Sequence, residues 1–147
     1  MRVGIAADHA GLELKREIAA HLRGGGHRVR DYGTDSADAV DYPAFVVTLA
    51  AALTGGEIER AIFCCGSGVG PAVAANKVRG VRAAVVSEEW SARDAVEHVD
   101  VNFLTLGQRV LGGELAKSIV DSFLGATAQG GRHARRRRQI AELESGR

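Results

Sequence analysis

The segment from Arg60 to Val78 constrains the fold of this chain most, because an apolar run leads through a glycine-rich turn into a helical pattern. Residues 61–65 are too few for a buried helix and end at a glycine, which favours a parallel strand buried on both faces. Glycines at positions 66, 68 and 70 permit a sharp turn, and Pro71 suits the first turn of a helix. These features together predict a cradle of free N–H groups for an anion or an oxyanion.

Cys65 is the last residue of this predicted strand and adjoins the glycine turn. The start of the following helix can stabilise a thiolate there, so Cys65 is a candidate reactive group. Buried cysteines more often serve as small hydrophobic residues, and this alternative stays open for Cys65. For Cys64, which should face a layer of helices, we expect a packing role alone.

Strand and helix patterns alternate along the chain. Apolar runs predict strands at 3–7, 27–32 (an edge strand), 61–65, 81–86 and 101–106, and helical spacing predicts helices at 12–22, 44–53, 71–77, 87–98, 112–124 and 131–143. The alternation predicts a three-layer α/β fold with a five-stranded parallel sheet and an extra C-terminal helix. Lys15 is expected on the polar side of its helix, and Ser87 or Ser91 as an N-cap.

The chain length of 147 residues suits one domain, residues 1–147, with a basic extension over about 126–147. In such sheets ligands bind beyond the carboxyl ends of the strands. Four residues stand at the C-terminal ends of predicted strands and therefore share this edge, namely Asp8, Cys65, Ser87 and Gly107. An acid, a thiol and a glycine cradle at one edge predict a binding site there.

Asp8 and His9 follow the first strand. In a purely structural interpretation Asp8 caps a helix and His9 is a solvated turn residue. In the functional interpretation Asp8 bonds to a sugar hydroxyl or ring oxygen, and His9 donates to an anion.

The C-terminal segment carries a cluster of arginines at 132 and 135–138. On a helix, Arg132 and Arg136 share a face and can grip one phosphate, which indicates a small phosphorylated substrate. A solvated basic face is the alternative. His98 should lie at the C-terminal end of a helix, far from Cys65. It is either a histidine favoured there by the helix dipole or part of a neighbouring subunit's site, and on the second interpretation we expect a dimer.

Charge and composition limit the other function classes. Lys and Arg number 19 against 18 Asp and Glu, so no overall field points to nucleic acid or a membrane. The N-terminal apolar run is too short for a signal or a membrane span, and two adjacent cysteines form no ordinary disulfide, so we expect a cytoplasmic protein. The histidine and cysteine spacing fits no metal site.

A nucleotide-binding module is the second class to consider. The run GSGVG at 66–70 is similar to a dinucleotide fingerprint, and Glu88 could bind a ribose hydroxyl. Pro71 occupies the place of the third glycine, which argues against this class. A nucleic-acid binder with a basic tail is the third class.

The chain resembles the ribose-5-phosphate isomerase B family, which also contains galactose-6-phosphate and allose-6-phosphate isomerases. The resemblance covers residues 3 to about 138 and rests on AADHAG-x-x-LK, DYG, DYP, CGSGVG with AANK, Ser87-Glu88, His98, LGQRV and GGRH. It implies a Rossmann-like domain, homodimers or tetramers with shared active sites, and a phosphorylated sugar as substrate. It implies no cofactor, no metal, no nucleic acid and no membrane partner.

The resemblance also implies roles for single residues. Cys65 would move the proton between C1 and C2, and Ser67 with the loop amides would stabilise an enediolate. Asp8 and His98 would assist ring opening. The residues expected to hold the phosphate and the sugar are His9, Tyr42, Gly66, Gly68, Val69, Gly70, Arg109, Arg132 and Arg136.

The implied reaction is a cofactor-independent aldose–ketose isomerisation, first of all of ribose 5-phosphate to ribulose 5-phosphate. Part of the family has a glutamate base at the position of Pro71, so here Cys65 must take that role. The family commonly has asparagine where this chain has Val99, which keeps erythrose 4-phosphate, allose 6-phosphate and galactose 6-phosphate open as substrates.

Overall fold

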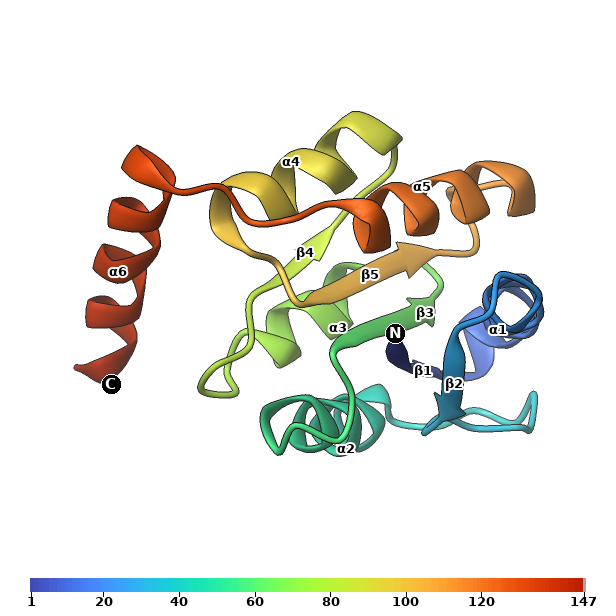
Figure 1. Cartoon of the computed structure of the whole chain (residues 1–147). Helices are drawn as coiled ribbons and strands as arrows, with labels where there is room; N and C mark the ends of the chain where they lie inside the picture. Colours follow the sequence, from blue (N-terminus) through green and yellow to red (C-terminus); the bar gives the residue numbers. More distant parts are fainter. Residues whose placement is uncertain (147) are drawn as a thin grey trace.

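Five parallel strands form the centre of the computed structural model, which describes residues 1–146 (Figure 1). The strands are β1 (Arg2–Ala7), β2 (Arg28–Asp31), β3 (Arg60–Cys65), β4 (Ala83–Val85) and β5 (Phe103–Gly107), in the order β2-β1-β3-β5-β4. The predicted edge strand is confirmed as β2. The central strand β3 lies between β1 and β5, and this position accounts for its unbroken apolar run.

Helices cover both faces of the sheet, which confirms the predicted three-layer α/β fold. The helices are a short 3₁₀ helix η1 (His9–Gly11), then α1 (Leu12–Gly24), α2 (Tyr42–Thr54), α3 (Val69–Ala75), α4 (Glu89–Val99), α5 (Gly113–Gly125) and α6 (Gly131–Ser145). One core contains α1, α4 and α5, and the other contains α2 and α3. No helix within residues 1–146 is both long enough and apolar enough to cross a lipid bilayer.

Neighbouring side chains of β3 alternate between the two cores, as the pleat of a strand requires. Cys64 packs with the helices α1, α4 and α5, whereas Cys65 packs on the side of α2. Burial raises the pKa of the Cys64 thiol well above its usual value, and the neighbouring Cys65 adds to that effect. The packing role expected for Cys64 fits this environment.

The helix α6 lies at one end of the molecule, apart from the sheet (Figure 1). It follows α5 through an extended segment and contacts α4. Two hydrogen bonds help to hold it: Arg137 Nη1 donates to the carbonyl oxygen of His98 at 3.2 Å, and Gly80 N donates to Glu144 Oε1 at 3.0 Å. The extra C-terminal helix predicted from the sequence is therefore confirmed.

Two local expectations were wrong. Neither Ser87 nor Ser91 caps α4; the carboxylate of Glu88 does, because its longer side chain reaches back to the N–H groups of Trp90 (2.6 Å) and Ser91 (2.7 Å). Lys15 is not on a solvated face but is 1% exposed, and its ammonium group contacts a carboxylate at the end of β2 and a carbonyl oxygen just after β2.

Candidate active site

Cys65 ends the central strand at the carboxyl edge of the sheet, where the glycine turn begins. Its side chain is 5% exposed, and its Sγ accepts the main-chain N–H of Gly68 at 3.0 Å. Gly68 has a φ of 84°, which glycine adopts without strain, and it stands at the N-cap position of α3. The start of α3 thus directs a main-chain N–H group at the sulfur of Cys65.

The glycine turn packs closely against Tyr42, the first residue of α2. A Cβ at Gly70 would lie 2.6 Å from the hydroxyl oxygen of Tyr42, so only glycine fits at this position. Ser67 Oγ accepts the N–H of Val69 at 3.3 Å and braces the turn. The structure therefore brings Tyr42 and the turn together.

The segment after β5 closes the turn from the other side. Gln108 N donates to the carbonyl oxygen of Cys65 at 2.7 Å, and Arg109 N donates to that of Gly66 at 3.0 Å. The guanidinium of Arg109 lies over the turn, since a Cβ at Gly66 would be 3.3 Å from its Nη1. Arg109 thus places a positive charge directly beside the glycine cradle.

Asp8 and His9 lie at the same edge, and the main-chain N–H of Asp8 donates to the carbonyl oxygen of Cys64 at 3.3 Å. Asp8 Oδ1 accepts the N–H groups of Ala10 (2.9 Å) and Gly11 (3.1 Å), so it does cap the 3₁₀ helix η1. His9 Nδ1 accepts the N–H of Val40 at 3.2 Å. The neutral ring of His9 therefore carries its proton on Nε2, which makes that nitrogen a hydrogen-bond donor.

Lys15 binds residues 31–35 at the end of β2 and just after it, a structural role that sequence reasoning missed. Its Nζ lies 2.7 Å from Asp31 Oδ2 and 3.2 Å from Asp35 Oδ1, and it donates to the carbonyl oxygen of Thr34 at 2.6 Å. The available signal was the cluster of aspartates at 31, 35, 38 and 41 beside a helix with a single lysine. Lys15 thus anchors the first part of the segment 31–40, and Val40 at the end of that segment donates to His9.

His98 lies elsewhere, on α4. Arg132 and Arg136, two of the three arginines expected to bind the phosphate, lie on α6. The ring of His98 stacks on that of His133, with centroids 3.9 Å apart and an angle of 10° between the planes. His133 Nε2 accepts from Arg132 Nε at 3.2 Å, and Arg136 follows one helical turn later. His98 therefore lies away from Cys65, as its position at the end of α4 predicted.

His133 was not among the predicted site residues, although it links His98 to Arg132. It is 7% exposed, and burial lowers its pKa, with further lowering by the charges of His98 and of Arg132. The ring is thus kept neutral, which lets Nε2 accept from the guanidinium of Arg132.

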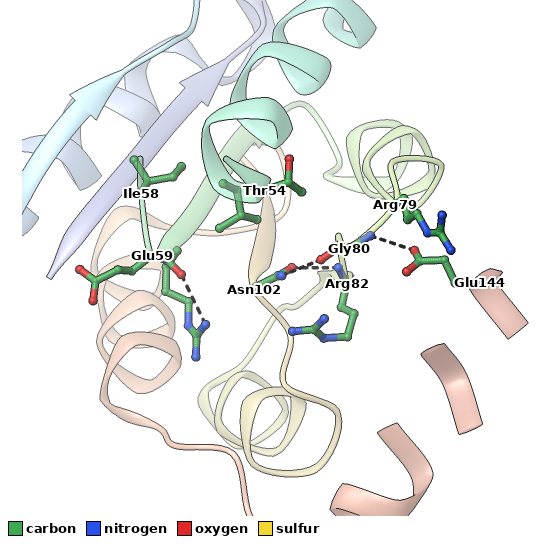
Figure 2. Close-up of a pocket in the computed structure, with 10 residues that line it drawn as sticks. Thr54, Ile58, Glu59, Arg79, Gly80, Arg82, Asn102 and Glu144 are labelled. Atoms are coloured by element: carbon green, nitrogen blue, oxygen red, sulfur yellow. Dashed lines mark hydrogen bonds between the residues drawn. The ribbon is translucent and has the colours of Figure 1, made fainter. Parts of the chain in front are cut away.

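Two cavities near α6 are separate from the glycine turn. One, of about 610 Å³, lies between the ends of α2 and α6, and Glu144 on its wall accepts the N–H of Gly80 (Figure 2). The second, of about 640 Å³, lies beneath α6. Cys65 lines neither cavity, and Arg82, which lines both, is already paired with Asp100 at 2.8 Å.

Within residues 1–146, the structure has no group of three or more His, Cys, Asp or Glu side chains that could hold a metal ion.

Comparisons with known proteins point to one family. A family model described as Ribose/Galactose Isomerase matches residues 3–140. Ribose-5-phosphate isomerase B of Escherichia coli (strain K12) is 47% identical over 143 residues, which cover 97% of this chain and 96% of the relative. D-erythrulose-4-phosphate isomerase of Pectobacterium atrosepticum is 37% identical, over 98% of this chain and 95% of the relative. The solved structure of ribose-5-phosphate isomerase B from Clostridium thermocellum has a TM-score of 0.97 at 49% identity and covers 99% of both chains.

Proposed function

Because this chain belongs to the ribose/galactose isomerase family and is an isomerase of a phosphorylated sugar, we propose that it interconverts ribose 5-phosphate and ribulose 5-phosphate. The identity of 47% to a ribose-5-phosphate isomerase B along nearly the whole chain supports this substrate. We further propose that residues 1–147 form one isomerase domain, with α6 as its extension.

In the proposed mechanism Cys65 is the base. Its thiolate removes the proton from C2 of the open-chain aldose, the electron pair moves to O1, and an enediolate forms. The thiol of Cys65, whose proton can exchange with water, then delivers a proton to C1, while the hydroxyl proton of O2 passes to O1, so the reaction needs no external oxidant or reductant. The observation that carries this proposal is the 3.0 Å hydrogen bond from Gly68 N to Cys65 Sγ, because it stabilises the charged sulfur at the glycine cradle.

The developing oxyanion would be stabilised by Ser67 and the main-chain N–H groups of the glycine turn. Each well-placed donor of this kind contributes roughly 10²–10³-fold to the rate. Val69 N already donates to Ser67 Oγ at 3.3 Å, so the hydroxyl of Ser67 is held at the turn. Tyr42, packed on Gly70, would form the wall of the sugar site.

We propose that two subunits complete each site. This proposal is supported by the placement of the residues. Cys65, His9 and Arg109 lie at the carboxyl edge of the sheet, whereas His98 ends α4 and Arg132 lies on α6. In a homodimer, or a tetramer built from dimers, the partner subunit would supply His98 for ring opening and both Arg132 and Arg136 for the phosphate. His9, through its Nε2 proton, and Arg109 would hold the phosphate from the near side.

A second candidate substrate is a four-carbon sugar phosphate. Val99 packs partly against the core next to His98 and offers no side-chain hydrogen bond to a sugar hydroxyl. The similarity to a D-erythrulose-4-phosphate isomerase agrees with a smaller substrate.

A nucleotide-binding role is less well supported, because both carboxylate oxygens of Glu88 accept N–H groups at the start of α4.

We also propose a cytoplasmic location, which the two free thiols support.

The substrate proposal is tested by measuring kcat/KM for ribose, erythrose, allose and galactose phosphates with the purified protein. We expect ribose 5-phosphate to give the highest value. A higher value for the erythrose compound would replace it with the second candidate.

A further inference from the structure

Asp94 and His98 lie one turn apart on α4, and their side chains are in contact. Asp94 Oδ1 is 2.7 Å from His98 Nδ1. A carboxylate accepts hydrogen bonds and cannot donate them, so the proton of the neutral imidazole must reside on Nδ1. The other ring nitrogen of His98, Nε2, then carries a free lone pair.

His133 restricts the same ring from one face. The two imidazoles stack at 3.9 Å, nearly parallel, and His133 is itself fixed by the hydrogen bond from Arg132 Nε. Within residues 1–146, no hydrogen-bond partner occupies Nε2 of His98. The side chain of His98 is 36% exposed. Because one face of the ring is covered and Nδ1 is occupied, Nε2 is its polar atom that remains open to a ligand.

We propose that Asp94 is a positioning residue for ring opening. This proposal rests on the proposed function of His98. Asp94 holds the imidazole in the Nδ1-protonated tautomer, so that Nε2 of the partner subunit's His98 takes the proton from O1 of the closed sugar. The C1–O1 bond becomes a carbonyl and the C1–O4 bond breaks. Nε2 then returns the same proton to O4, so protons and electrons balance.

The tautomer can be read directly by nitrogen NMR on protein labelled with ¹⁵N-histidine. The chain has five histidines, and a His98→Gln variant assigns the signals of His98. In the native protein we expect a protonated Nδ1 and an unprotonated Nε2 for the neutral ring. In Asp94→Ala, where the acceptor is missing, we expect the His98 proton to redistribute toward Nε2.

The kinetic test separates ring opening from proton transfer at carbon. Ribulose 5-phosphate is an open-chain ketone because its C5 oxygen carries the phosphate, so exchange of its C1 hydrogen with D₂O needs no ring opening. We expect Asp94→Ala to lower kcat on ribose 5-phosphate by about 10- to 100-fold, with an exchange rate that stays at about half the native value or more. KM should change little, because the contact that Asp94 makes is with His98 and not with Arg132 or Arg136, which would bind the phosphate.

Asp121→Ala is the matched control. Asp121 Oδ1 lies 2.8 Å from His21 Nε2 in a similar carboxylate–imidazole pair between α5 and α1, and this pair does not include His98. This variant should keep the native kcat and the native tautomer of His98.

The proposal is overturned if native His98 carries its proton on Nε2, or if Asp94→Ala leaves either the tautomer or kcat unchanged. A parallel loss of isomerisation and of C1 exchange would also contradict it, since a general collapse of the site would then explain the defect. If native protein turned over none of the phosphorylated sugars, the proposed function would fail, while the NMR measurement would still decide whether Asp94 sets the tautomer.

Discussion

The sulfur of Cys65 and the main-chain N–H of Gly68 are joined by a 3.0 Å hydrogen bond at the point where the central strand passes into α3. This contact depends on the left-handed backbone of Gly68, because the positive φ turns the chain back toward the sulfur. The thiol of Cys65 and the glycine turn are therefore one structural unit, and the first prediction concerns this unit.

Gly68→Ala should destabilise the protein by about 1–3 kcal/mol, because a φ of 84° is strained for alanine. Its Cβ would also lie 3.2 Å from Val85 Cγ1, so the packing around the turn must adjust, and we expect turnover to fall. Gly112→Ala is the control, since Gly112 has a φ of −73° and open space around the site of a Cβ. Urea unfolding of both variants checks the prediction, and equal destabilisation would contradict it.

Lys15→Met should weaken substrate binding without touching the substrate. The change leaves the carbonyl oxygen of Thr34 and the carboxylate of Asp31 without their cation, at a cost of about 1–3 kcal/mol. The segment that bonds to His9 Nδ1 would loosen, so KM for the phosphorylated sugar should rise more than kcat falls.

The neighbouring Arg16→Met serves as a control for the Lys15 variant, because Arg16 is about half exposed and its loss should cost less than about 1 kcal/mol. Thermal unfolding and steady-state kinetics on both variants provide the comparison. A Lys15 variant with native KM would show that this segment does not position His9.

Mild acid should destabilise the packing of α6 through His133. Burial lowers the pKa of His133 in the folded protein below its ordinary value of 6.5, so the unfolded chain binds a proton first as the pH falls through that value. Stability linked to this group is thus present at pH 7.5 and decreases as the pH falls below about 6.5.

The measurement is the free energy of unfolding at several pH values between 7.5 and 5, for the native protein and for His133→Gln. The variant should show a smaller loss of stability on acidification, since its side chain does not titrate in this range. Identical pH dependence in the two proteins would mean that His133 contributes nothing to it.

Shared sites predict complementation between two inactive variants. In a mixed dimer of Cys65→Ala and His98→Gln subunits, one site receives an intact Cys65 from one subunit and an intact His98 from the other. Random reassortment of equal amounts should restore about a quarter of the native activity, because half of the dimers are mixed and each has one complete site. Mixtures that stay inactive would argue that each chain builds its own site.

Much of this architecture could be predicted from local sequence patterns. The five apolar runs, the glycine turn and the position of Cys65 at the end of the central strand depend on residues that are close along the chain. The placement of His98 far from Cys65 followed from the direction of α4, which a parallel sheet fixes.

The remainder depends on contacts between distant segments. Lys15 was expected in solvent because its helix alone offers no partner, and the oxygens that surround it come from residues 31–35. The stack of His98 on His133 joins α4 to α6 across 35 positions of sequence, a pairing that no periodic pattern encodes. The Asp94–His98 contact has i,i+4 spacing, yet its importance emerges only once the stack fixes the ring.

The central claim is that the Cys65 sulfur, and not its neighbour, is the base. The most direct test compares kcat on ribose 5-phosphate for Cys65→Ala and Cys64→Ala, after circular dichroism has shown that both variants are folded. We predict a loss of about 10²–10⁴-fold or more for Cys65→Ala and a near-native kcat for Cys64→Ala, whose side chain lies in the opposite core. A folded Cys65→Ala protein with near-native kcat would contradict the account.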